Sequence, residues 1–86
     1  QQAPRLYRAL QAVAAHIQNG SRDVAALEQG AHGELETLGW RVDYVAVRDA
    51  DTLLAPSTGT NTFVVLGAAW LGKTRLIDNI EVFLGD

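Results

Sequence analysis

The chain of 86 residues contains no cysteine, and this absence excludes both a disulfide framework and thiolate metal sites. Basic residues are also scarce, because seven Lys and Arg stand against ten Asp and Glu and leave a formal net charge of −3. The seven are scattered along the sequence, so few phosphates could be neutralised together and no nucleic-acid partner is expected.

Long apolar runs and targeting signals are absent as well. The longest apolar run, residues 63–71, is far shorter than the ~20 residues of a membrane-spanning helix, so no membrane partner is expected. The first residues, Gln1-Gln2-Ala3, show neither an initiator Met nor a signal-peptide pattern. We therefore expect a cytoplasmic location and a chain that is part of a longer protein.

What the sequence does contain is an ordinary globular composition, with 48% hydrophobic and 20% charged residues. Its length predicts one small domain with a modest core. No internal repeat or low-complexity tract interrupts it.

Two amphipathic helices are predicted in the first half. One covers residues 4–19, and its apolar stripe comprises Leu6, Leu10, Val13 and Ile17. The other covers residues 22–38 with Ser21 as N-cap, and its stripe comprises Val24, Leu27, Ala31, Leu35 and Leu38. Because the loop between the helices is short, antiparallel packing is expected.

Gly30 and Gly33 lie inside the second predicted helix. Each costs roughly 1 kcal/mol of helix stability relative to Ala. Either they let another element approach closely, or the helix is weak at this point.

The second half begins with two predicted strands. Residues 41–48 alternate in polarity, which predicts a strand. Its two faces would carry Val42, Tyr44 and Ala46 on one side and Asp43, Val45 and Val47 on the other. Turn-forming residues around Pro56 and Gly59 predict a polar surface loop. The nearly continuous apolar run of residues 62–70 then predicts a central strand.

Residues 74–84 have two interpretations. Leu76, Ile80, Val82 and Leu84 alternate as in a strand, with Asp78 interrupting that face. A helical stripe fits much of the same segment. Periodicity alone leaves both interpretations open.

The segment from Gly67 to Thr74 matches the phosphate-binding pattern G-x-x-x-x-G-K-[ST], with Gly67, Gly72, Lys73 and Thr74 as the candidate ligand residues. The interior of the match is bulky where phosphate needs close backbone approach. Only 12 residues follow Thr74, which leaves no strand to carry the metal-binding Asp of such sites. We therefore interpret the segment as part of a β-hairpin, with a small P-loop nucleotide-binding module as the alternative.

Four short segments occur in a distinctive order: Val42-Asp43-Tyr44-Val45, Asp49-Ala-Asp-Thr-Leu53, Ala68-Ala69 with Gly72, and Arg75-Leu-Ile-Asp-Asn-Ile80. Together they resemble the C-terminal domain of the pantoate–β-alanine ligase (pantothenate synthetase) family, over essentially the whole chain. The resemblance implies an α+β fold in the order α-α-β-β-β, with two antiparallel helices packed on a three-stranded antiparallel sheet. It makes residues 74–84 a strand, and its structural signature is Arg75, Asp78 and Asn79.

The resemblance also implies a function. The full enzyme of this family joins pantoate to β-alanine with ATP and Mg²⁺ through a pantoyl-adenylate, and it is expected to be a homodimer. Its catalytic motifs lie in an N-terminal nucleotidyltransferase domain, the partner that this chain would cover as a hinged lid. None of those motifs matches this chain, so no catalytic, cofactor-binding or metal-binding residue is assigned to it. A stand-alone protein-interaction domain that uses its exposed sheet face is a further alternative.

Other candidate residues have structural interpretations. His16 and His32 are predicted at or near the surface rather than as metal ligands, because no third ligand has a suitable spacing. Asp49 and Asp51 resemble a metal-binding pair, but they open a turn in which Asp accepts from backbone N–H groups.

Asp78 lies in an apolar segment, so it must find hydrogen-bond partners, either loop backbone donors or Arg75. Trp40 and Trp70 are predicted in the core or facing a hinge. Trp70, near the tip of the predicted hairpin, could instead press on the partner domain.

Overall fold

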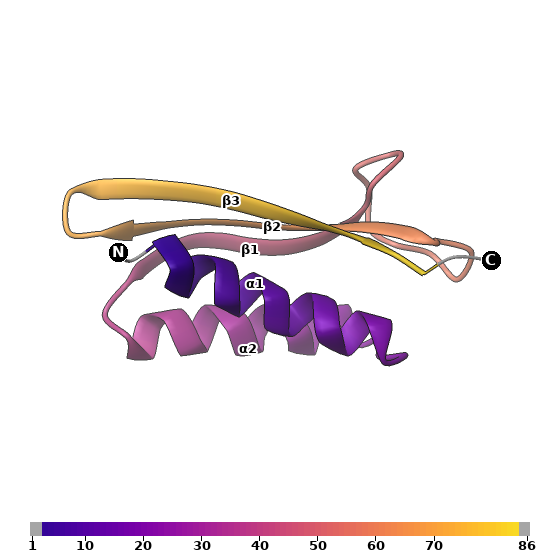
Figure 1. The fold of residues 1–86 in the computed structure, drawn as a ribbon, viewed down its shortest axis with the longest axis horizontal. Coiled ribbons are helices and arrows are strands. Elements are labelled where there is room, and N and C mark those ends of the chain that lie inside the picture. The colour runs from indigo at the N-terminus through magenta and orange to yellow at the C-terminus, as the bar shows by residue number, and fades with distance from the viewer. Residues whose placement is uncertain (1–2, 85–86) are drawn as a thin grey trace.

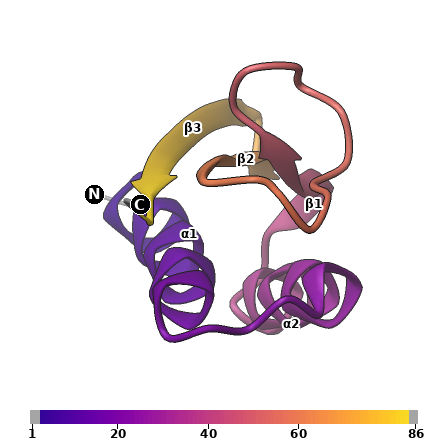
Figure 2. The same ribbon diagram turned by 90° about the vertical axis from the view of Figure 1, so that its right-hand side faces the viewer.

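The chain folds into two layers in the computed structural model, which describes residues 3–84. Helices α1 (Ala3–Gln18) and α2 (Val24–Thr37) precede strands β1 (Arg41–Asp49), β2 (Thr62–Leu71) and β3 (Thr74–Phe83). The strands form one antiparallel sheet in the order β1-β2-β3, and both helices cover the same face of it (Figures 1 and 2). The predicted α+β fold and its element order are confirmed.

The predicted stripe of α1 faces the sheet. Leu6, Leu10, Val13 and Ile17 are all almost completely buried. Two residues after the helix, Gly20 has a left-handed φ of +103°, and the N–H groups of Gly20 and Ser21 donate to the carbonyls of Ile17 and His16. This pair of hydrogen bonds is a Schellman motif, for which glycine is the favoured residue.

Helix α2 begins later than predicted, because its N-cap is Asp23 and not Ser21. The Asp23 carboxylate accepts from the N–H of Ala26 at 3.3 Å. Ser21 is already used by the end of α1, where its N–H bonds the His16 carbonyl at 2.9 Å. Within the short linker, Ser21 therefore completes the end of α1, and Asp23 caps the start of α2.

The two glycines of α2 face open space. A Cβ added at Gly30 or Gly33 would meet nothing within 4 Å. Close approach of another element is therefore not the reason for either glycine. The remaining interpretation is that the helix is weak at this point.

The predicted alternation of β1 is wrong, because the strand contains an irregularity between Val42 and Tyr44. One extra residue, Asp43, is accommodated there, as in a β-bulge. Val42, Val45 and Val47 consequently all pack on the helix side, whereas Tyr44 is 41% exposed on the other side.

Strand β2 is the central strand and is buried on both faces, as its continuous apolar run predicts. The last segment, for which periodicity left a strand and a helix open, forms strand β3. Its residues Leu76, Ile80 and Val82 pack on the core, while Ile77 and Phe83 are exposed on the uncovered face. Two residues, Gly72 and Lys73, connect β2 to β3, and Gly72 has the positive φ of +62° that a two-residue hairpin turn requires.

Candidate functional site

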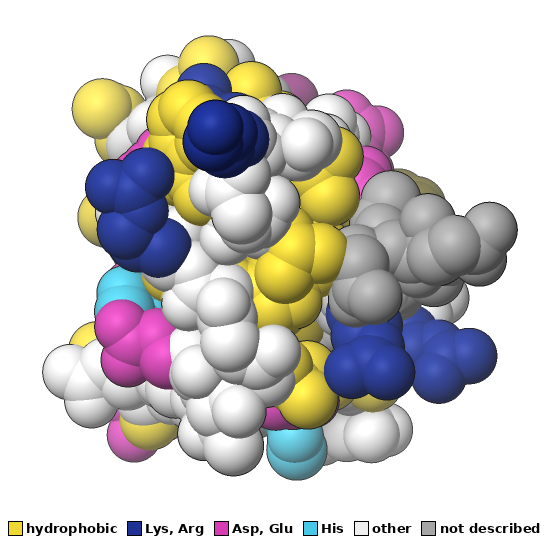
Figure 3. All heavy atoms as spheres, turned by 90° about the vertical axis from the view of Figure 1, so that its left-hand side faces the viewer, with side chains coloured by type: hydrophobic (Ala, Val, Ile, Leu, Met, Phe, Trp, Pro, Cys, Tyr) yellow, Lys and Arg dark blue, Asp and Glu magenta, His cyan; other side chains and the backbone are white. Residues whose placement is uncertain are grey.

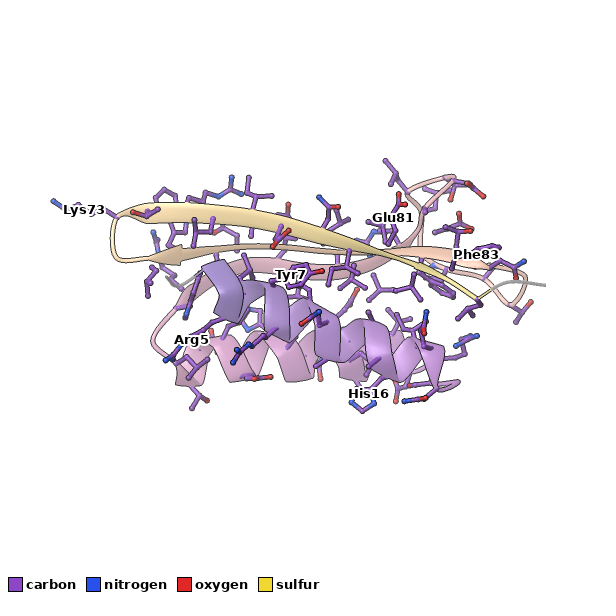
Figure 4. All side chains as sticks on the ribbon, viewed as in Figure 1. Arg5, Tyr7, His16, Lys73, Glu81 and Phe83 are labelled. Carbon is purple, nitrogen blue, oxygen red and sulfur yellow. The ribbon has the colours of Figure 1, made fainter. Side chains whose placement is uncertain are left out.

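The residues of the phosphate-binding pattern lie in the β2–β3 hairpin. Gly67 is inside β2 and against α1, where an added Cβ would lie 3.0 Å from Cδ2 of Leu10. Lys73 is at the far tip of the hairpin, and Thr74 begins β3 (Figure 4). A P-loop wraps phosphate with backbone N–H groups at the start of a helix. Here strand pairing engages the backbone on both sides of the turn, and β3 follows instead of a helix.

The signature residue Arg75 pairs with Asp43. Its Nε donates to Oδ2 of Asp43 at 2.8 Å, which joins β3 to β1 across the central strand. Ala68 of that central strand is fully buried although it does not belong to the helix-side core. Its register partners on the two edge strands are Tyr44 and Ile77.

Asp78 and Asn79 are adjacent in β3, and their side chains therefore lie on opposite faces of the sheet. Asp78 is half-buried and alternates with Leu76 and Ile80, so it lies on the helix side of the sheet, while Asn79 is exposed. The Asp78 carboxylate accepts from the neighbouring N–H of Asn79 at 2.8 Å. Of the two kinds of partner expected for Asp78, Arg75 is wrong, because it lies on the opposite face and reaches Asp43. The observed donor is a backbone N–H, but it belongs to the neighbouring residue of β3 and not to a loop.

Cationic side chains gather at the end of the sheet that carries the hairpin tip. Arg41 and Arg75 both pair with Trp70, from β1 and from β3, and Lys73 lies in the adjacent turn. The guanidinium of Arg41 lies 5.2 Å from the ring centroid of Trp70, in cation–π contact. Figure 3 views the molecule from this end and shows Lys and Arg side chains with apolar side chains between them.

The uncovered face of the sheet is apolar at its centre. Tyr44 of β1 and Ile77 of β3 both pair with Ala68, and they are 41% and 61% exposed. The loop of residues 50–61 stands above the same face (Figures 1 and 2) and exposes Leu53 and Leu54. We call Tyr44, Ile77, Leu53 and Leu54 the outer apolar surface.

Asp49 organises that loop. Its Oδ1 accepts from the N–H groups of Asp51 and Thr52 at 2.8 and 3.3 Å, and its Oδ2 accepts from the Thr60 hydroxyl at 2.9 Å. The bonds from Asp51 and Thr60 lower the pKa of the Asp49 carboxyl below its ordinary value of 3.8. The turn role predicted for Asp49 is thus present in the structure. Leu53 has a φ of +62°, so the loop holds an exposed leucine in a conformation that β-carbon sterics disfavour.

Sequence reasoning missed Glu28. Its Oε2 accepts from the N–H of Val47 at 2.8 Å and lies 3.6 Å from Nη1 of Arg48, so α2 covers a hydrogen-bonding group of the edge strand β1. Such covering opposes pairing with another strand. No local pattern connects Glu28 to Val47, because 19 positions separate them.

The remaining candidates are dispersed. His16 is exposed, with its side chain directed away from the sheet (Figure 4), and His32 lies 3.6 Å from Glu36 one helical turn later. Trp40 is buried, and its Nε1 has no hydrogen-bond partner within residues 3–84.

Within residues 3–84, no group of three or more His, Asp or Glu could hold a metal ion. None of the helices described there is long and apolar enough to cross a membrane.

The structure is therefore an α+β domain in which one face of the sheet is left uncovered by the helices. Comparison with known sequences identifies the family: the model of pantoate-beta-alanine ligase matches residues 1–81. The chain therefore belongs to the pantoate–β-alanine ligase family, as the sequence resemblance indicated.

Individual relatives agree with this assignment. The pantothenate synthetase of Chromobacterium violaceum is 58% identical over 82 residues, which cover 95% of this chain and 30% of the relative. That of Laribacter hongkongensis is 52% identical over 83 residues, covering 96% and 30%, respectively. That of Thiobacillus denitrificans is 54% identical over 81 residues, covering 94% and 29%. The chain thus spans about 30% of the length of the curated relatives it matches.

Proposed function

We infer that this chain is the C-terminal lid domain of a pantoate–β-alanine ligase and closes over a nucleotidyltransferase domain that precedes it in the full enzyme. The full reaction would condense pantoate with β-alanine, using ATP and passing through a pantoyl-adenylate. The observation that carries the inference is the outer apolar surface, because the helices cover only the other face of the sheet.

Closure of a lid would keep water away from the reacting groups. An acyl-adenylate is a reactive mixed anhydride, so a site that forms one benefits from excluding water until the amine attacks. An exposed apolar sheet face suits this purpose, since its burial against another domain is favourable and expels water at the same time. Tyr44 and Ile77 lie at the centre of that face and would be covered on closure.

Within this proposal the chain contributes closure rather than chemistry. It supplies no catalytic residue, and we assign no Mg²⁺ ligand to it, since residues 3–84 bring no group of three or more His, Asp or Glu together. ATP and Mg²⁺ would be bound by the preceding domain. The proposal includes a cytoplasmic, homodimeric full enzyme, as expected for the family.

The test is to mix this chain with the separately produced nucleotidyltransferase domain of the same ligase and to measure pantothenate formation. We expect slow turnover by that domain alone and a clear increase when the chain is added. The variant Tyr44→Ser/Ile77→Ser should weaken the increase. Tyr7→Ser is the matched control, because Tyr7 is as exposed as Tyr44, at 42% against 41%, but lies on α1.

Two results would contradict the proposal. One is a nucleotidyltransferase domain whose turnover is already complete and does not respond to the chain. The other is micromolar binding of ATP·Mg by this chain alone that Lys73→Ala abolishes, which would support the P-loop alternative in spite of the hairpin geometry.

A further inference from the structure

We propose that Arg41, Lys73 and Arg75, the cationic hairpin end, bind phosphate oxygens of the nucleotide when the lid closes. This inference rests on the proposed function, which supplies a nucleotide for the lid to cover. It adds a ligand class and named residues to a domain that would otherwise only exclude water.

Positive charge is concentrated at the cationic hairpin end. The chain as a whole carries a formal net charge of −3, yet Arg41 and Arg75 flank Trp70 on neighbouring strands and Lys73 lies in the adjoining turn. Asp43 is the carboxylate that contacts this group, at 2.8 Å from Arg75. Three cations against one carboxylate leave a local excess of positive charge that suits a polyphosphate.

Both arginines of the cationic hairpin end are held by contacts with neighbouring side chains. The guanidinium carbon of Arg41 lies 5.2 Å from the ring centroid of Trp70, a cation–π contact that limits where this side chain can point. Within residues 3–84 the hydrogen bond of the Arg75 side chain is the one from Nε to Asp43, so its two Nη groups can serve a ligand. Oriented guanidinium groups lose less conformational freedom on binding an oxyanion, and they can bind it through two parallel hydrogen bonds.

The cationic hairpin end also lies at the end of the domain where α1 begins (Figure 1). Lys73 projects from the hairpin tip, away from the body of the domain (Figure 4). The first turn of α1, where the polypeptide enters the domain, lies at the same end of the molecule as that tip (Figure 1). A domain that precedes α1 in the chain would therefore adjoin the cationic hairpin end. Arg41 and Arg75 belong to the same sheet end and would face it together with Lys73.

The test uses the full-length ligase that carries this sequence. We expect Lys73→Ala and Arg41→Ala each to raise the KM for ATP about threefold, and the double variant about tenfold, with the KM for pantoate unchanged. Lys73→Arg keeps the charge and should stay within about twofold of the parent enzyme. Arg8→Ala is the control, because Arg8 is an exposed cation on α1. Arg75 is left intact, since its loss would also break the pair with Asp43.

Ionic strength gives a second readout. Charge contacts with phosphate weaken in salt, so the KM for ATP of the parent enzyme should rise with added NaCl more steeply than that of the double variant. The inference is overturned if the double variant has the KM for ATP of Arg8→Ala. It is also overturned if the KM values for ATP and pantoate rise equally, which would mean that these cations pair with carboxylates of the neighbouring domain. Failure of the lid proposal itself is recognised separately, as a nucleotidyltransferase domain that does not respond to this chain.

Discussion

Arg75 of β3 and Asp43 of β1 meet across the central strand, with Nε 2.8 Å from Oδ2, although 32 positions separate them in the sequence. Both side chains are a little over a third exposed. Asp43 is the extra residue at the irregularity of β1, so the bulge directs a carboxylate onto the uncovered face where Arg75 lies. The pair thereby links the two edge strands near the hairpin end.

A double-mutant cycle with Asp43→Ala and Arg75→Ala should measure a coupling free energy of about 0.5 kcal/mol, the usual size for a partly exposed ion pair. Urea unfolding of the four proteins provides the measurement. Because the pair is accessible to solvent, the coupling should shrink in 1 M NaCl, where the Debye length is about 3 Å. Strictly additive single effects at low salt would show that the contact contributes nothing to stability.

Sequence periodicity was sufficient for α1 and the central strand, but the stripe predicted for α2 ends in Leu38, which lies past the helix and is 42% exposed. It failed at β1, where the irregularity at Asp43 moves Val45 and Val47 to the same side as Val42. A bulge is a one-residue event that strand alternation cannot encode in advance. Periodicity also could not decide between a strand and a helix for residues 74–84. The resemblance to a family was needed to predict the strand.

The contacts of the candidate site were less predictable than the fold. The partner of Arg75 depends on the register of three strands and on the bulge, and neither follows from local spacing. Arg41 reaches Trp70 for the same reason. Asp49 was predictable as a turn residue, because an Asp accepts from N–H groups two and three positions later in the chain.

Gly30→Ala and Gly33→Ala should each stabilise the domain by roughly 0.5–1 kcal/mol. Both positions are helical, and an added Cβ meets nothing within 4 Å, so the gain in helix propensity carries no steric cost. Gly20→Ala is the matched contrast, because Gly20 has a φ of +103° and its substitution should destabilise the domain. Thermal unfolding of the variants shows whether each substitution stabilises or destabilises the domain. A loss of stability at Gly33 would mean that its helical turn is held in another conformation.

Asp49 should make stability depend on pH in the acidic range. Its pKa in the folded protein is lowered by the Asp51 N–H and the Thr60 hydroxyl, so folding favours the ionised form. The contribution is therefore complete above the ordinary pKa of 3.8 and is lost as the pH falls through the lowered value. The difference in unfolding free energy between the parent and Asp49→Ala should be largest near neutral pH and smallest in strong acid. Asp51→Ala is the matched control variant, because the Asp51 side chain makes none of these bonds.

Asp78 places a carboxylate on the helix side of β3, an edge strand of the sheet. Within residues 3–84 this carboxylate accepts its hydrogen bond from the adjacent N–H of Asn79, so the bond ties β3 to no other element. Inward-pointing charges on edge strands are a known device against pairing with further strands. We therefore expect Asp78 to limit self-association at the cost of some stability.

Asp78→Thr should raise the unfolding free energy by about 1 kcal/mol, because Thr has the higher strand propensity and no charge to desolvate. The same variant should shift the chain toward dimers, measured by sedimentation over a range of concentrations. Asn79→Thr is the matched control: it makes a similar change one residue later, on the exposed side, and leaves the inward charge in place. If Asp78→Thr unfolds more easily than the parent and sediments like it, the carboxylate stabilises this fold and does not protect its edge.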